Sequence, residues 1–126
     1  MLVIRQEQMN VFSLHMLEGF VGRVAAHLRE WFPGQCDVLD EPALREVVRG
    51  GVRRAGQYGI RTEFDVWRFV DLMFFYGRDF DAEFPAAVAI LADDDLGGNE
   101  KVNRLYVELD AVPAESLKEA ELVAAP

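Results

Sequence analysis

Three carboxylates alternate directly after a glycine in the second half of the chain: Asp79, Asp81 and Glu83. Paired carboxylates can exchange protons with a substrate or bind a metal ion. They can equally cap a following helix or bind an arginine of an earlier helix. No histidine lies near them in the sequence and no second acidic motif accompanies them, so the pattern favours a structural role over catalysis.

The remaining nucleophilic or metal-binding side chains are few. His15 and His27 are twelve positions apart on one expected helix, which puts them about 120° apart around its axis and does not predict a metal site. The single cysteine, Cys36, follows Pro33-Gly34 in an expected loop. Without a histidine partner nearby it reads as an inert thiol, and alone it cannot form an internal disulfide. The sequence therefore predicts no catalytic, metal-binding or cofactor-binding residue.

The acidic segment Asp93–Asn99 has the beginning of a calcium-loop pattern, with acidic residues at positions one and three and glycine at position six. Positions five, nine and twelve fall on Gly97, Lys101 and Arg104, although a calcium loop needs oxygen ligands there. A solvated acidic loop is the better interpretation.

A basic stripe is expected on the helix that begins near residue 40. Arg45, Arg49 and Arg53 follow one another at intervals of four, with Arg54 beside them. The functional interpretation is a docking surface for an acidic protein partner. The alternative is a solvated face that pairs with the acidic C-terminal half of the chain. Nucleic acid is disfavoured because no aromatic residues accompany the stripe and the net charge of the chain is −9.

The most apolar stretch, residues 66–76, predicts a helix that is apolar around nearly its whole circumference. Thr62 provides a start signal and Gly77 a stop signal. A helix of this kind is buried on most sides. Its aromatic residues cannot all face one core, so Trp67 and Phe74 are predicted to contribute to a partner-binding surface.

The periodicity of apolar residues predicts an all-α fold, a single compact bundle of four to five helices. A close packing contact or a kink is expected at Gly50-Gly51. Residues 1–112 are expected to form the helical domain and residues 113–126 an acidic, flexible tail. The expected helices cover about Gln6–Phe32, Asp40–Tyr58, Thr62–Gly77, Phe84–Ala92, and a last segment that Asn99 caps and Pro113 ends.

Composition limits the function classes. The chain has 126 residues, of which 51% are apolar, which is typical of one folded domain. Residues 1–78 carry no net charge, so the whole −9 lies in residues 79–126. No signal-peptide core and no apolar run of about 20 residues is seen, so we expect a cytoplasmic protein without a membrane span.

Four motifs resemble a small, uncharacterised bacterial family encoded beside type VI secretion effector and spike genes. The matching positions are Ile4-Arg5-x-x-Gln8-Met9, Tyr58-Gly59-Ile60-x-Thr62-Glu63-x-Asp65-Val66, Asp71-Leu72-Met73-Phe74-x-x-Gly77-x-Asp79-Phe80-Asp81 and Lys101-x-x-Arg104-Leu105-Tyr106. The resemblance implies a cytoplasmic accessory, chaperone, adaptor or immunity protein. It brings no established catalytic residue.

Three functional hypotheses follow. The first is a non-enzymatic chaperone or adaptor that binds a type VI effector or spike component, with a second copy of the chain as a further candidate partner. The second is an immunity protein whose negative charge suits a basic toxin. The third is a small enzyme using Asp79, Asp81 or Glu83. The residues predicted to bind a partner are Arg45, Arg49, Arg53, Trp67 and Phe74.

Overall fold

The computed structural model describes residues 14–109, and every regular element in that range is a helix. The all-α prediction is confirmed for these residues, whereas the expected helix start near Gln6, the domain boundary at residue 112 and the tail 113–126 lie outside them. The helices are α2 (Leu14–Trp31), α3 (Pro33–Cys36), α4 (Glu41–Gln57), α5 (Glu63–Tyr76), α6 (Phe80–Glu83), α7 (Pro85–Leu91) and α8 (Gly98–Glu108).

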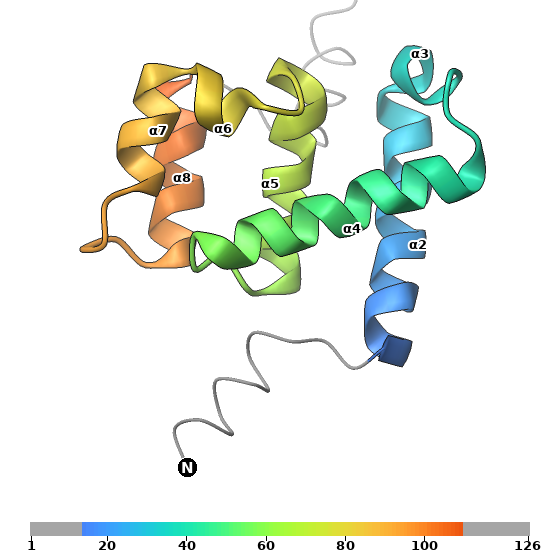
Figure 1. Ribbon diagram of the computed structural model, residues 1–126, viewed down its shortest axis with the longest axis horizontal. Coiled ribbons are helices and arrows are strands. Elements are labelled where there is room, and N and C mark those ends of the chain that lie inside the picture. The colour runs from blue at the N-terminus through green and yellow to red at the C-terminus, as the bar shows by residue number, and fades with distance from the viewer. Residues whose placement is uncertain (1–13, 110–126) are drawn as a thin grey trace, which may run out of the picture.

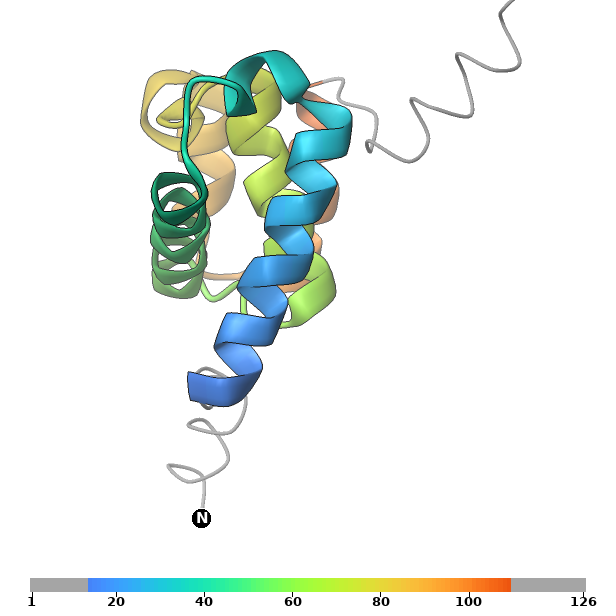
Figure 2. The ribbon, with the colours of Figure 1, turned by 90° about the vertical axis from the view of Figure 1, so that its right-hand side faces the viewer.

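The long helix α4 lies across α2 and α5, and it packs against both (Figure 1). Helices α7 and α8 lie on the side of α5 that is away from α2, with α6 leading into them. In the view turned by 90°, α4 is seen end-on while α2 and α5 run beside each other (Figure 2). Helix α5 is therefore the central element, in contact with α2, α4, α6 and α8.

Helix α5 supplies much of the core, as its composition predicts. Its buried apolar side chains are Val66, Phe69, Val70, Leu72, Met73 and Phe74. The Phe69 ring packs on that of Phe80 with a centroid distance of 5.3 Å. Each such side chain contributes about 1.5–3 kcal/mol when fully buried. Despite this apolar character, none of the helices between residues 14 and 109 is long and apolar enough to cross a membrane.

The signals that begin and end α4 and α5 are confirmed. The Asp40 side chain caps α4 by accepting a hydrogen bond of 2.9 Å from a backbone N–H of the first turn. Thr62 caps α5 in the same way at 3.2 Å. Gly59 and Gly77 have φ angles of 82° and 120°, which residues with a Cβ rarely adopt. These local features position α4 and α5 relative to the turn between them.

Two short helices were not predicted. Pro33 begins α3 instead of a loop, and Cys36 at its end is buried. The acidic segment after Gly77 forms α6, which buries Phe80 completely. The described residues thus hold seven helices where the sequence predicts four or five. A four-residue helix is barely longer than one turn and has too few apolar positions to reveal a period.

The start of the last helix corrects one prediction. Gly97, not Asn99, is the N-cap of α8, and Asn99 lies within its first turn. The amide of Asn99 instead donates a hydrogen bond of 2.9 Å to Asp65 Oδ1 on α5. The Glu100 carboxylate accepts one from the Gly97 N–H, also at 2.9 Å. Asn99 therefore ties α8 to α5 and does not cap its own helix.

The glycine pair in α4 marks a close contact and not a break. Helix α4 runs without interruption through Gly50 and Gly51. A Cβ at Gly51 would lie 2.9 Å from Val70 Cγ2 and 3.0 Å from Met73 Sδ on α5. The missing side chain at Gly51 therefore lets α4 and α5 cross at short distance. Of the two predicted alternatives, a close packing contact and a kink, the close contact is the one observed.

Candidate functional site

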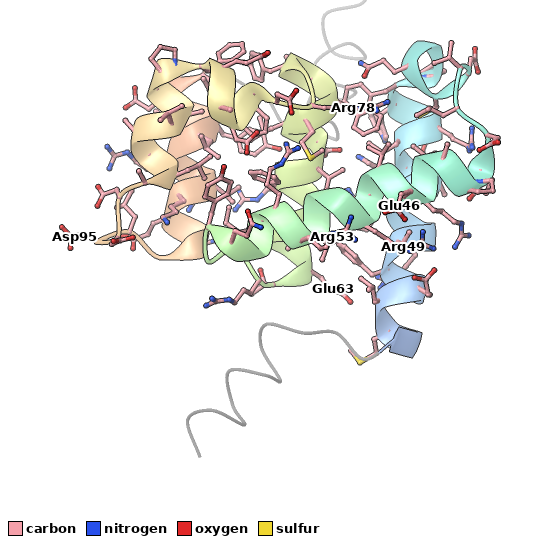
Figure 3. The ribbon with its side chains drawn as sticks, in the orientation of Figure 1. Glu46, Arg49, Arg53, Glu63, Arg78 and Asp95 are labelled. Carbon is pink, nitrogen blue, oxygen red and sulfur yellow. The ribbon has the colours of Figure 1, made fainter. Side chains whose placement is uncertain are left out.

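The predicted basic stripe on α4 is a chain of ion pairs. Arg45 pairs with Glu41 at 2.8 Å, Arg49 with Glu18 at 2.7 Å, and Arg53 with Glu46 at 3.3 Å. Figure 3 shows Glu46, Arg49 and Arg53 side by side along α4. All these glutamates belong to residues 1–78, so the expectation that the stripe pairs with the acidic C-terminal half is wrong for these three arginines.

The ion pairs change how the stripe can act. Hydrogen bonds from the arginine side chains hold the pKa of Glu18, Glu41 and Glu46 below the usual range. The Glu18 hydrogen bond is also the main reason why the pKa of Arg49 is raised. These carboxylates already neutralise much of the positive charge of the stripe. An acidic partner would therefore have to displace them.

Of the acidic trio behind the enzyme hypothesis, Asp79 and Asp81 contact the C-terminal part of α4. Asp81 is buried, and its carboxylate accepts hydrogen bonds from Arg54 at 3.0 Å and from the Tyr58 hydroxyl at 2.6 Å. Asp79 pairs with Arg54 at 3.5 Å, and Glu83 is exposed. Burial, followed by the hydrogen bond to Asp81, raises the pKa of Tyr58 to about 12. These contacts join α4 to α6. They match the alternative in which the carboxylates bind an arginine of an earlier helix.

Trp67, a predicted partner-binding residue, is half-buried between α5 and α2. Its ring packs edge-on against Phe20 and His27, at centroid distances of 6.1 and 5.1 Å. The Nε1 atom of Trp67 is buried and makes no hydrogen bond within the described part of the chain. His27 is itself buried, with Nε2 2.8 Å from Asp71 Oδ1. Trp67 therefore contributes to helix packing as well as to the surface.

The other predicted anchor, Phe74, belongs to the core. It is 3% exposed, and its ring lies 5.8 Å from that of Phe32. The next residue, Phe75, is 42% exposed. Because α5 is apolar on all sides, its sequence does not reveal which aromatic faces outward; the packing of neighbouring helices decides it.

A second exposed aromatic, Phe64, was not singled out from the sequence. Phe64 is 66% exposed in the first turn of α5. At about 100° per residue, Phe75 lies about 20° and Trp67 about 60° from it around the helix axis. Met73, about 180° away, faces α4 instead. Phe64, Trp67 and Phe75 lie on what we call the outer face of α5. The middle of this face, at Trp67 and Asp71, is covered by His27 of α2, so the exposed aromatic surface is at its two ends, Phe64 and Phe75.

Residues 14–109 contain no group of three or more His, Cys, Asp or Glu side chains arranged to hold a metal ion. Burial raises the pKa of the Cys36 thiol, which keeps it protonated and unreactive. His15 lies in α2, where only its backbone is described. No protein-family model matches the chain, and comparisons with curated proteins and with solved structures give no significant match.

Proposed function

We propose that this chain is a non-enzymatic binding protein that docks a protein partner on the outer face of α5. The carrying observation is the exposed Phe64, which is 66% accessible on a helix otherwise largely buried. The partner class, a type VI secretion effector or spike component held by an accessory chaperone or adaptor, rests on the sequence resemblance. Aromatic anchors in the centre of an interface commonly provide most of its binding energy.

The exposed ring of Phe64 is held in place by its surroundings. The Arg68 guanidinium lies 4.5 Å from the ring centroid. Arg68 is fixed in turn by hydrogen bonds of 2.9 Å to Asp65 and to Asn103. Burial alone would raise the pKa of Asp65, but the hydrogen bonds from Arg68 and Asn99 outweigh it and keep the pKa low. A rigid anchor loses little conformational entropy on binding, which favours association.

A binding assay on a purified partner tests this proposal. A type VI effector or spike component recovered from the native bacterium would be titrated calorimetrically against the wild type and Phe64→Ala. Loss of an anchor worth about 2 kcal/mol corresponds to about a 30-fold rise in Kd. Val38→Ala is the matched control because Val38 is 82% exposed but lies between α3 and α4. Equal affinity of the wild type and Phe64→Ala would refute docking on this face.

The immunity-protein alternative is favoured by a different observation, the exposed acidic side chains of the α6–α8 half. They are Asp79, Glu83, Asp93, Asp94, Asp95, Glu100 and Glu108. A basic toxin bound to them would dissociate more readily as salt rises, because exposed charges are screened. Docking on an apolar anchor depends much less on salt, so one salt series with the same partner separates the two functions.

A second copy of the chain is the remaining candidate for the outer face of α5. Sedimentation of the purified protein over a range of concentrations would show self-association. A dimer that Phe64→Glu dissociates and Val38→Glu leaves intact would make the partner a second copy, in place of a secretion component.

A further inference from the structure

A polar pocket lies where the end of α4, the turn before α5, the α7–α8 loop and the start of α8 meet. Its volume is about 370 Å³. Asp95, labelled in Figure 3, marks the α7–α8 loop that forms one side of this region. The cationic side chains of Arg61 and Lys101 line the pocket, together with the backbone of Gly97 and Gly98.

Lys101 is a buried cation without a carboxylate partner. It is 5% exposed, and its Nζ donates hydrogen bonds of 2.9 Å to the carbonyl oxygens of Tyr58 and Leu91. Among the described residues no carboxylate lies within ion-pair distance of this ammonium. Since an ammonium group has three N–H bonds, two carbonyls leave one donor unused. A buried charge that is only partly compensated favours a bound counter-ion.

Arg61 adds a second cation that the chain does not neutralise. Its Nε atom is buried and without a hydrogen-bond partner, and within residues 14–109 Arg61 forms no ion pair. The arginines on α4 behave differently, since Arg45, Arg49 and Arg53 each bind a glutamate. In a chain with a net charge of −9, an arginine left unpaired beside a buried lysine indicates a ligand with negative charge.

The start of α8 contributes backbone donors to the same place. Gly97 is the N-cap and has no side chain that could accept from the first turn, so the N–H groups of Gly98, Asn99 and Glu100 form no hydrogen bond with the described residues. Gly98 must be glycine, because a Cβ there would lie 2.3 Å from the Gly59 carbonyl oxygen. The Glu100 carboxylate already accepts from the Gly97 N–H at this end. The three N–H groups of the first turn nevertheless keep their donors, and such donors at the positive end of a helix dipole bind anions.

We propose that this pocket binds a phosphate group, either inorganic phosphate or a phosphomonoester. Lys101, Arg61 and the first turn of α8 line the pocket from three different segments of the chain, and together they offer several donors to the oxygens of one oxyanion. The pocket is larger than a phosphate ion, so an organic part can be accommodated. Asp94 and Gln57 also line it. Asp94 is exposed, so solvent screens the repulsion between its carboxylate and a bound phosphate.

Titration of the full chain with inorganic phosphate and with glucose 6-phosphate, at constant ionic strength set by chloride, tests the site. Amide resonances of Gly97, Gly98 and Asn99 are expected to shift and to saturate with both probes. Arg61→Gln is the first variant because Arg61 forms no hydrogen bond or ion pair within the described residues, and it is expected to weaken binding at least about tenfold, or 1.4 kcal/mol. Arg104→Gln is the matched control, because Arg104 is an exposed arginine on α8 that does not line the pocket. This variant should leave the titration unchanged.

The outcomes separate the two ligand sources. Tighter binding of glucose 6-phosphate than of phosphate makes the ester the ligand class, and equal binding makes phosphate itself the ligand. Shifts that do not saturate, or that persist unchanged in Arg61→Gln, overturn the site. If circular dichroism shows that the Lys101→Met variant is folded, this variant should bind neither probe. Phe64→Ala leaves this titration unaffected, so the pocket and the outer face of α5 are tested independently.

Discussion

His27 Nε2 lies 2.8 Å from Asp71 Oδ1, and both side chains are more than nine-tenths buried between α2 and α5. The Trp67 ring covers the histidine edge-on at 5.1 Å. The hydrogen bond joins residues 44 positions apart in the sequence. A polar pair inside an apolar contact penalises any other pairing of the two helices, because a shifted register would bury both groups without a partner.

The first prediction is energetic coupling within this pair. Asp71→Leu leaves a buried His27 nitrogen without its acceptor and should cost about 1–3 kcal/mol of the free energy of unfolding. His27→Leu should cost a similar amount. The double variant should lose less than the sum by about 0.5–3 kcal/mol, measured by urea unfolding of all four proteins. Strict additivity would show that the hydrogen bond does not contribute to stability.

The second prediction concerns the turn between α4 and α5. Gly59→Ala should lower the free energy of unfolding by about 1–2 kcal/mol, because a Cβ is strained at its φ of 82°. Gly19→Ala is the matched control. Gly19 lies inside α2 with no atom near its would-be Cβ, so this change should stabilise the protein by about 0.5–1 kcal/mol. In thermal unfolding, Gly59→Ala should lower the midpoint temperature and Gly19→Ala should raise it. A shift of both midpoints in the same direction would show that the φ angle of Gly59 is not the cause.

The third prediction concerns the start of α5. Thr62→Ala removes the oxygen that accepts from the Asp65 N–H and should cost about 1 kcal/mol. Thr62→Ser keeps the acceptor and should retain most of the stability. Denaturant unfolding of both variants distinguishes loss of the cap from loss of the threonine methyl group. An equal loss of stability in the Ser and Ala variants would assign the effect to the methyl group.

The fourth prediction is a loss of stability at high pH through Tyr58. Its pKa is raised to about 12 in the folded chain, against about 10 for an ordinary tyrosine. Because the neutral hydroxyl is favoured by folding, this contribution is complete below pH 10 and is lost as the pH rises towards 12. The stability difference between wild type and Tyr58→Phe should shrink across that window. In the tyrosinate absorbance titration, one late step should disappear in Tyr58→Phe.

The boundaries of α4 and α5 were predictable because their causes are local. Thr62 and Gly77 act within one turn of themselves, so the sequence reveals where α5 begins and ends. The exposed aromatic was not predictable, because the choice between Phe74 and Phe75 depends on where other helices pack. The same holds for the basic stripe, since Glu18 pairs with Arg49 across 31 positions.

The candidate pocket illustrates this limit most clearly. Arg61 and Lys101 are 40 positions apart, and no spacing pattern in the sequence connects the two. They line one pocket because α8 approaches the turn at Gly59 closely enough to require Gly98. The close approach of Gly98 to Gly59 exists only in the folded chain, so no pattern along the sequence reveals it.

The two carbonyls bound by Lys101 also determine how the chain opens. One belongs to the end of α4 and the other to the end of α7, while the lysine itself is on α8. Fraying at either C-terminus withdraws an acceptor from a buried charge, which weakens the other terminus as well. We therefore expect the ends of α4 and α7 and the start of α8 to open together, as one cooperative unit.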